Sequence, residues 1–123
     1  MTTKQRILIV DDEVDVSTPL QFLLEQQGAF EVKTSTGGQG AINLARAFQP
    51  HICLVDVMMP GMDGGDLVAL MEKDPQLRNI PIVFLSAGVR PEETQNTIGR
   101  HPLVSKLMSV PDLVRTLERY LKR

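Results

Sequence analysis

The sequence predicts a doubly wound α/β domain, in which helices cover both faces of a parallel β-sheet. Its 123 residues suit one domain, long enough to bury roughly two-thirds of the surface of the unfolded chain. Helical patterns alternate with short apolar segments, which implies right-handed crossovers between parallel strands. Three of these segments are continuous apolar runs, as expected when both faces of a sheet are covered. The predicted strands are Ile7–Val10, Phe30–Thr34, Ile52–Val55, Ile82–Leu85 and Leu103–Val104.

Four amphipathic helices are predicted between and after these strands. Gly28 is placed to end the first helix, whereas Pro19 inside it predicts a late start or a kink near its beginning. Ser109 and Asp112 have the spacing of a capping box that opens the last helix. The apolar stripes are, in chain order, Val16, Leu20, Leu23 and Leu24; Ala41, Leu44, Ala45 and Phe48; Leu67, Leu70 and Met71; and Leu113, Leu117 and Leu121.

The segment from Pro91 to Gly99 has the weakest pattern in the chain. Pro91 could open a helix, but Ile98 is the only apolar residue between Glu92 and Arg100. A helix here would have little to bury. We therefore expect a short, exposed or partly irregular helix that is mobile and becomes ordered when a partner binds.

The bulk composition excludes several classes of protein. An apolar fraction of 42% and a net charge of −2 are typical of a soluble globular domain and give no basic patch for nucleic acid. The single cysteine, Cys53, lies in an apolar run and is expected to be a buried hydrophobic residue. No segment suggests a membrane span or a signal peptide. We expect one cytoplasmic domain over residues 1–123, with residues 1–5 as a short polar tail.

Charged or hydroxyl-bearing side chains follow four of the five predicted strands. In an open parallel sheet, ligands bind at the carboxyl ends of the strands. Taken singly, each residue has a simpler explanation: a helix cap for either aspartate after the first strand, an ordinary turn hydroxyl, or a solvated lysine. Taken together, they predict a functional site. The residues are Asp11, Asp12 and Glu13 after the first strand, then Asp56, Ser86 and Lys106.

Converging acids at this edge require positive charge. Two carboxylates about 4 Å apart repel each other by about 4 kcal/mol at an effective dielectric constant near 20. Lys106 supplies one positive charge, and a hard divalent metal would supply the rest. Oxygen ligands without cysteine or histidine favour Mg²⁺, Mn²⁺ or Ca²⁺ over Zn²⁺. His51 and His101 are expected to lie at the wrong end of the strands for this site.

This set of groups suits phosphoryl transfer. A carboxylate beside a metal can attack a phosphoryl group and form an aspartyl-phosphate. The metal and the lysine would neutralise the charge on the equatorial oxygens. A serine hydroxyl within reach could donate to the new phosphate, so that the added charge biases a two-state element.

Four motifs in order carry a resemblance to a known family: ILIVDDE, LVDVMMPGMDG, IVFLSA and the lysine of VSK. Over almost its whole length the chain resembles the response-regulator receiver domain of two-component signalling, of the CheY-like superfamily. The resemblance implies a flavodoxin-like fold whose five parallel strands have the order 2-1-3-4-5. It also implies a signalling switch rather than a classical enzyme, one that takes part in its own phosphorylation and dephosphorylation.

The resemblance implies a role for each matching residue. The metal would be Mg²⁺, with Mn²⁺ as an alternative, and the phosphoryl donor a sensor histidine kinase or a phosphotransfer protein. The implied roles are phospho-acceptor for Asp56; metal ligands for Asp11, Asp12, Asp56 and the backbone carbonyl of Met58; switch hydroxyl for Ser86; phosphoryl pairing for Lys106; and the turn after the acceptor for Pro60, Gly61 and Gly64. Met58 apart, the methionines of this turn look incidental.

The sequence departs from the family pattern in three places. Leu107 follows Lys106 where proline with a cis peptide is usual; a non-proline cis bond costs about 2.5–4 kcal/mol, so this junction is expected to be trans or strained. Leu103 stands where an aromatic switch residue is usual. The stretch between Ser86 and Lys106 is also about two residues shorter than the family pattern. All three departures lie on the face formed by the fourth helix, the fifth strand and the last helix, through which two copies could pair as a homodimer.

Two other functions compete with a phosphorylated switch. The first is a protein-binding module that keeps the fold but works without phosphorylation, which the altered face favours and the intact site residues disfavour. The second is an enzyme. A flavin carrier needs a hydroxyl- and glycine-rich loop after the first strand, where this chain has acids, and a phosphatase of the haloacid dehalogenase type needs an acid where Met58 stands.

Overall fold

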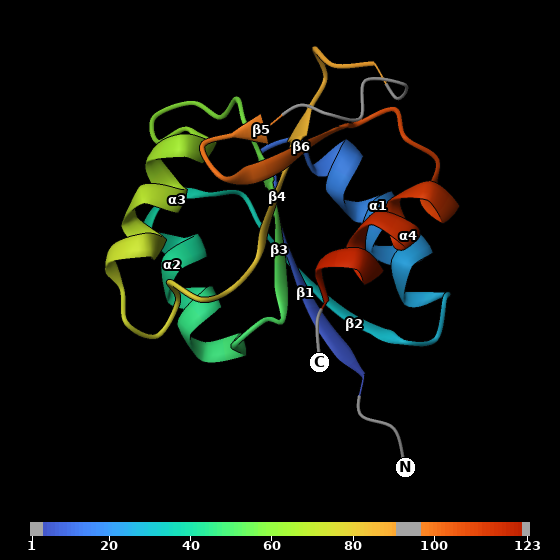
Figure 1. Ribbon diagram of the computed structural model, residues 1–123, viewed down its shortest axis with the longest axis horizontal. Coiled ribbons are helices and arrows are strands. Elements are labelled where there is room, and N and C mark those ends of the chain that lie inside the picture. Colours follow the sequence, from blue (N-terminus) through green and yellow to red (C-terminus); the bar gives the residue numbers. More distant parts are fainter. Residues whose placement is uncertain (1–3, 91–96, 122–123) are drawn as a thin grey trace.

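The computed structural model describes residues 4–90 and 97–121, which form a three-layer α/β sandwich around one sheet (Figure 1). The helices α1 and α4 cover one face of the sheet, and α2 and α3 cover the other. The strands are β1 (Gln5–Val10), β2 (Phe30–Ser35), β3 (Ile52–Asp56), β4 (Ile82–Ser86), β5 (Thr97–Ile98) and β6 (His101–Ser105). The helices are α1 (Val14–Glu25), α2 (Gly38–Phe48), α3 (Gly64–Lys73) and α4 (Val110–Tyr120).

The sheet has the order β2-β1-β3-β4-β6-β5. Neighbouring strands from β2 to β6 pair in parallel, which confirms the predicted order 2-1-3-4-5 with β6 as the fifth parallel strand. Two of the strands begin earlier than predicted, β1 at Gln5 and β6 at His101. The carboxyl ends of β1, β3, β4 and β6 therefore meet at one edge, where the sequence predicts the site.

The five predicted parallel strands are all present, and a sixth, unpredicted strand lies at the edge of the sheet. Thr97–Ile98 form β5, antiparallel to β6, where the sequence predicts part of a helix. Gly99 turns the chain between the two strands with a φ of 60°. Having few apolar side chains to bury, this backbone obtains its hydrogen bonds by pairing with β6 instead. Residues 91–96, including the predicted helix start at Pro91, lie outside the described residues, and the expected mobility there is untested.

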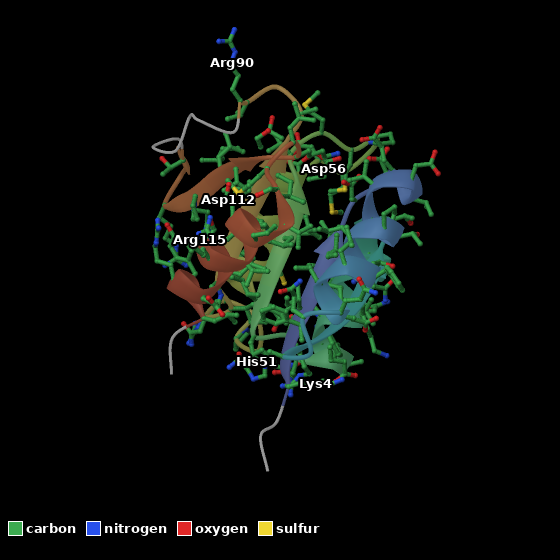
Figure 2. The ribbon with its side chains drawn as sticks, turned by 90° about the vertical axis from the view of Figure 1, so that its right-hand side faces the viewer. Lys4, His51, Asp56, Arg90, Asp112 and Arg115 are labelled. Atoms are coloured by element: carbon green, nitrogen blue, oxygen red, sulfur yellow. The ribbon has the colours of Figure 1, made fainter. Side chains whose placement is uncertain are left out.

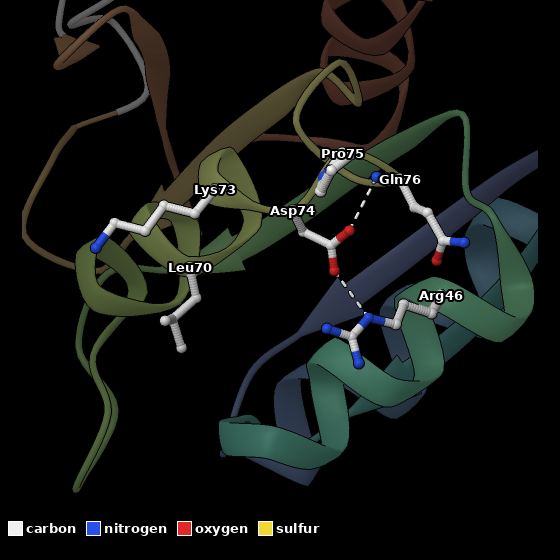
Figure 3. Close-up of a pocket in the computed structure, with 6 residues that line it drawn as sticks. All are labelled: Arg46, Leu70, Lys73, Asp74, Pro75 and Gln76. Atoms are coloured by element: carbon white, nitrogen blue, oxygen red, sulfur yellow. Dashed lines mark hydrogen bonds and ion pairs between the residues drawn. The ribbon is translucent and has the colours of Figure 1, made fainter.

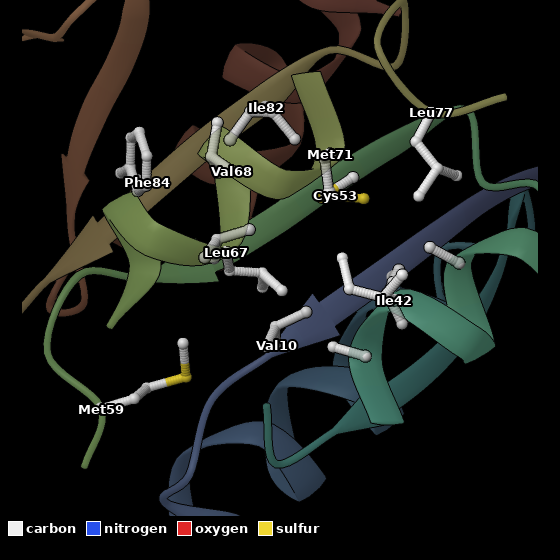
Figure 4. Close-up of a cluster of buried hydrophobic side chains, with 14 residues drawn as sticks. Val10, Ile42, Cys53, Met59, Leu67, Val68, Met71, Leu77, Ile82 and Phe84 are labelled. Carbon is white, nitrogen blue, oxygen red and sulfur yellow. The ribbon is translucent and has the colours of Figure 1, made fainter. Parts of the chain in front are cut away.

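The core consists of two clusters separated by the sheet. Along β3, Ile52 and Leu54 face α1 and α4, whereas Cys53 and Val55 face α2 and α3. Figure 4 shows the cluster on the α2 and α3 side, with Cys53 among its side chains. This alternation is the period of a strand buried on both faces. Cys53 is fully buried, which raises the pKa of its thiol to about 12 and leaves it an unreactive hydrophobic residue, as predicted.

The helix predictions hold in part. Helix α1 begins at Val14, so Pro19 in its interior does not delay its start, and Gly28 follows its end with a φ of 86°. Two of the predicted apolar stripes include residues that are not buried, because Leu23 and Leu70 are each 40% exposed. Each of these helices lies on the outside of the sandwich and buries only the narrower stripe that faces the sheet.

Two helices of the chain begin with a capping side chain. In α4, Ser109 Oγ accepts a hydrogen bond from the backbone N–H of Asp112 at 3.3 Å, which confirms the cap but not the reciprocal bond of the predicted capping box. Helix α3 begins with a reciprocal capping box between Asp63 and Asp66, which the sequence analysis did not predict. The box fixes the start of α3 just after the turn that follows Asp56. Within residues 4–90 and 97–121, no helix is both long enough and apolar enough to cross a membrane.

Candidate functional site

Three predicted acids converge at the carboxyl ends of β1 and β3. Carboxylate oxygens of Asp11, Asp12 and Asp56 lie within 4.8 Å of one another. Asp11 is fully buried, Asp56 is 3% exposed and Asp12 is half-buried. The pairing of Val10 with Val55 brings Asp11, which follows β1, beside Asp56, the last residue of β3. The sequence thus buries negative charge at this edge, as predicted.

The Lys106 ammonium joins these acids from the end of β6. Its Nζ lies 3.0 Å from Asp11 Oδ2 and 3.3 Å from Asp56 Oδ2. It also lies 2.9 Å from Oε1 of Glu13, which the sequence analysis placed at this edge but gave no role. The Lys106 side chain is only 8% exposed, and its backbone N–H donates to the Ser86 carbonyl at 2.9 Å. Lys106 is therefore an internal cation of the cluster rather than a solvated lysine.

The turn after Asp56 brings α3 against the backbone of Asp56 itself. A Cβ on Gly64 would lie 2.3 Å from the Asp56 carbonyl oxygen, closer than any side chain could approach. Gly61 has a φ of 80°, which also favours glycine. Both residues belong to the turn that the family resemblance implies. The close approach at Gly64 depends on how α3 meets β3 in space, which no local pattern reveals.

The methionines of this turn have different environments. Met58 is 77% exposed, and its backbone N–H donates to Asp56 Oδ1 at 3.3 Å. Met59 is not incidental, because it is 8% exposed and belongs to the core between the sheet and the α2 and α3 helices (Figure 4). Its sulfur would lie 3.1 Å from a Cβ on Gly37. Met59 therefore anchors the turn to the core while Met58 faces solvent.

Ser86 ends β4 beside the cluster. It pairs with Ser105 across β4 and β6, which places it next to Lys106. The Ser86 hydroxyl accepts a hydrogen bond from the backbone N–H of Gly88 at 3.0 Å and keeps its own proton for another acceptor. Among the described residues it makes no hydrogen bond to Asp56 or Lys106. Because β4 lies between β3 and β6 in the sheet, Ser86 stands between Asp56 and Lys106 without bonding to either through its hydroxyl.

The junction after Lys106 is trans, since the described residues contain no cis peptide bond. Ser105, which is 2% exposed, fixes this turn by accepting a hydrogen bond on its Oγ from the backbone N–H of Leu107 at 2.9 Å. Leu107 itself is 74% exposed. Leu103, the second departure from the family pattern, is half-buried against the core.

The cluster shifts the proton affinities of its own members. Burial, followed by the charge of Asp11, raises the pKa of Asp56 to about 6, although the Met58 N–H and Lys106 act in the opposite direction. Burial alone would lower the pKa of Lys106, but the carboxylates of Glu13, Asp11 and Asp56 outweigh it and raise that pKa. The hydrogen bond from Lys106 lowers the pKa of Glu13. Near neutral pH the lysine is charged, and most of the Asp56 population is an unusually basic carboxylate.

The donor set fits a hard divalent cation. Oδ2 of Asp11 is buried and lies 3.0 Å from the Lys106 ammonium, but within the described part of the chain no donor meets it with hydrogen-bond geometry, although a buried carboxylate oxygen normally has such a donor. All the converging ligand atoms are oxygens, which suits Mg²⁺ or Mn²⁺. His51 precedes β3 and His101 begins β6, so both lie at the amino ends of these strands, away from the cluster. Figure 2 shows His51 far from Asp56, and His101 binds Glu72 on α3 at 2.9 Å.

A shallow hollow at the outer side of α2 and α3 is separate from this cluster (Figure 3). In it, the Asp74 carboxylate accepts a hydrogen bond from Arg46 Nε at 2.8 Å and one from the backbone N–H of Gln76 at 2.9 Å. These bonds lower the pKa of Asp74, the Gln76 bond more than the Arg46 bond. The two hydrogen bonds tie the end of α3 to α2. The residues that line the hollow include none of the predicted site residues.

Comparisons with known proteins agree with this geometry. A family model described as the response regulator receiver domain matches residues 7–118. The polar-differentiation response regulator DivK of Brucella ovis is 29% identical over 97% of this chain and 97% of its own length. The chemotaxis protein CheY4 of Vibrio cholerae is similar in structure, with 27% identity, a TM-score of 0.82, and coverage of 96% of this chain and 99% of that one. The receiver domain of the sensor histidine kinase PA1611 from Pseudomonas aeruginosa, solved with a magnesium ion in its active site cleft, shares the fold at 24% identity, with a TM-score of 0.82 over 97% of this chain and 98% of that one.

Proposed function

The chain belongs to the response regulator receiver domain family of two-component signalling, and we propose that it accepts a phosphoryl group on Asp56 from a phosphohistidine. The donor would be a sensor histidine kinase or a phosphotransfer protein. The observation that carries the proposal is the contact of 3.3 Å between Lys106 Nζ and Asp56 Oδ2 inside a buried acidic cluster. A structural carboxylate at a strand end needs neither the neighbouring acids nor a buried lysine.

In the proposed reaction, a carboxylate oxygen of Asp56 attacks the phosphorus atom. An O–P bond forms as the P–N bond to the histidine breaks, and the imidazole keeps the electron pair and takes up a proton. Lys106 donates hydrogen bonds to the phosphoryl oxygens, where negative charge accumulates. Burial keeps water away from Asp56, which strengthens this interaction. The raised pKa makes Asp56 a better nucleophile while leaving it ionised near neutral pH.

A divalent cation fits the remaining acids. Asp11, Asp12 and Asp56, with the Met58 carbonyl, would hold Mg²⁺, or Mn²⁺ as an alternative. When bound, the cation would neutralise charge on the transferred group. Ser86 would then donate its free hydroxyl proton to the phosphoryl group after a movement at the end of β4. Because the Ser86 carbonyl binds the Lys106 N–H, such a movement would reach β6 and the edge of the sheet.

Incubation of the protein with acetyl phosphate and Mg²⁺ tests the proposal. We expect an acid-labile mass increase of one phosphoryl group on the intact protein, and none on Asp56→Asn, which should fold normally. If the folded wild-type protein forms no adduct, the alternative of a binding module that works without phosphorylation takes its place. Labelling of Asp56→Asn would mean that another residue is the acceptor.

The surface that would respond is formed by β5, β6 and α4. Its departures from the family pattern, Leu103 and Leu107, favour a partner specific to this chain, and pairing of two copies through this face is part of the proposal. Size-exclusion chromatography with light scattering before and after phosphorylation would detect such a dimer. A cytoplasmic location and the absence of nucleic acid binding remain predictions from the sequence.

A further inference from the structure

Glu13 occupies a fixed position at the mouth of the acidic cluster. It is the residue before α1, and its backbone N–H donates to Asp11 Oδ1 at 2.8 Å. Its carbonyl accepts hydrogen bonds from the backbone N–H groups of Val16 and Ser17, which open the helix. The backbone of Glu13 is therefore held on both sides. Its side chain is 59% exposed but turns back to reach Lys106.

The contact with Glu13 is the best directed of those made by the Lys106 ammonium. Glu13 Oε1 is the nearest carboxylate oxygen, at 2.9 Å, and it accepts a hydrogen bond. Asp11 Oδ2 lies 3.0 Å away but lacks hydrogen-bond geometry, and Asp56 Oδ2 lies at 3.3 Å. A lysine side chain loses rotamer freedom when it is held in one place. A directed hydrogen bond at its tip is what selects one of those rotamers.

We propose that Glu13 is a positioning residue, which holds the Lys106 ammonium beside Asp56 so that the lysine is in place when the phosphoryl group arrives. This inference rests on the proposed phosphorylation of Asp56. In that function the carboxylates of Asp11 and Asp56, which also lie near Lys106, would have other partners. Asp11 would bind the cation, and Asp56 would carry the phosphoryl group. Only Glu13 stays available to Lys106 throughout. An ammonium has three protons, so it can keep Glu13 while donating to phosphoryl oxygens.

A set of substitutions at Glu13 separates the reach of the side chain from its charge. Glu13→Asp keeps the charge but is one methylene shorter, Glu13→Gln keeps the length without the charge, and Glu13→Ala removes both. The matched control is Asp15→Asn, which removes one exposed acid from the first turn of the same helix. Because Glu13 is exposed, all variants should fold, and circular dichroism would check this.

The first measurement is the rate of phosphorylation by saturating acetyl phosphate and Mg²⁺. We expect Glu13→Ala and Glu13→Asp to react roughly tenfold more slowly, Glu13→Gln to be intermediate, and Asp15→Asn to match the wild type. The Mg²⁺ concentration that gives half the maximal rate should stay unchanged. A wild-type rate in Glu13→Asp would overturn the proposal, since charge alone would then suffice. A large shift in the Mg²⁺ requirement would overturn it too, because Glu13 would then be a metal ligand.

The second measurement does not depend on phosphorylation. In ¹⁵N NMR at low temperature, the hydrogen-bonded Lys106 ammonium should give a protected signal in the wild type and in Asp15→Asn. It should disappear in Glu13→Ala and Glu13→Asp, because water then exchanges the protons freely. If the signal is unchanged in Glu13→Ala, Glu13 does not position Lys106. If the wild type forms no phosphoryl adduct, the proposed function fails, whereas the ammonium signal still decides whether Glu13 positions Lys106.

Discussion

The acidic cluster and the β5–β6 hairpin lie in the same sheet but are held in place by different forces. In the cluster, Asp11 and Asp56 are buried at the ends of central strands, and an internal lysine binds both. The hairpin pairs only two residues of β5, and its surface contacts are those of Glu72 with His101 at 2.9 Å and with Arg100 at 3.4 Å. Removing one partner of a buried ion pair is strongly destabilising, because it leaves an unpaired buried charge. Exposed ion pairs contribute little to the free energy of unfolding. Changes in the cluster should therefore alter chemistry, and changes in the hairpin should alter stability slightly.

The largest combined effect on stability and phosphorylation is expected for Gly64→Ala, although this residue carries no functional group. Its new Cβ would collide with the Asp56 carbonyl oxygen at 2.3 Å, so either α3 or the acceptor must move. We expect a loss of stability of about 1–3 kcal/mol and phosphorylation slowed roughly 100-fold by the misplaced acceptor. Urea denaturation and the acetyl phosphate assay measure the two effects separately.

Gly65→Ala is the matched control in the same helix. There the Cβ meets only a side-chain oxygen of Asp63 at 3.4 Å, and alanine favours a helix by roughly 0.5–1 kcal/mol over glycine. This variant should be at least as stable as the wild type and phosphorylated at its normal rate. Equal damage from both substitutions would mean that the whole start of α3, rather than the contact at Gly64, supports the site.

The next effect concerns the cost of ionising Asp56 when no divalent metal is present. Its pKa is raised by burial and by Asp11 from 3.8 to about 6. A raised pKa means that folding favours the protonated form of Asp56. Its contribution to the free energy of unfolding is therefore most favourable below pH 3.8 and becomes less favourable as the pH rises through about 6. A rise of about two pKa units corresponds to at most roughly 3 kcal/mol. With EDTA present, Asp56→Asn should therefore be more stable than the wild type at pH 8 and nearly equal to it at pH 4.

Urea denaturation at both pH values measures this difference, and Mg²⁺ should reduce it by stabilising only the wild type strongly. Asp15→Asn, in which an exposed acid is neutralised, controls for net charge. If Asp56→Asn shows no advantage at pH 8, Lys106 already balances the buried acids, and the cluster has no need of a metal for its stability.

The contrast between the two regions also explains which predictions from the sequence succeeded. Asp11, Asp56 and Lys106 could be assigned to one site because apolar runs locate the strands and a parallel sheet brings strand ends together. Local patterns carry that information. The role of Gly64 and the burial of Met59 depend on the distance between α3, β3 and α2, which no local pattern contains.

The hairpin could not be predicted for a related reason. Thr97 and Ile98 have no alternating pattern of their own, and a two-residue strand exists only because β6 provides backbone partners. The sequence also did not show which acid binds Lys106. Glu13 follows Asp12 directly and looks like a second helix-capping acid, and only the fold brings it within 2.9 Å of a lysine 93 residues further along the chain.

The smallest effect is expected at the hairpin, for Glu72→Gln. The hydrogen bond from His101 is the main cause of the lowered pKa of Glu72. Burial acts in the opposite direction, and the charges of His101 and Arg100 lower the pKa further. A lowered pKa means that the carboxylate stabilises the fold above its ordinary value of 4.5 and that this contribution is lost as the pH falls below it. Because the side chain is 41% exposed, the loss in Glu72→Gln should stay under about 1 kcal/mol near pH 6 and shrink towards pH 3.

Glu118→Gln, which alters an exposed acid on α4, is the control for this change and should leave stability unaltered at either pH. Phosphorylation by acetyl phosphate should proceed at the wild-type rate in Glu72→Gln, because α3 contacts the acceptor through Gly64 at its other end. A slowed reaction would show that the β5–β6 hairpin and the acidic cluster are coupled even before a phosphoryl group arrives. The hairpin would then influence the chemistry as well as respond to it.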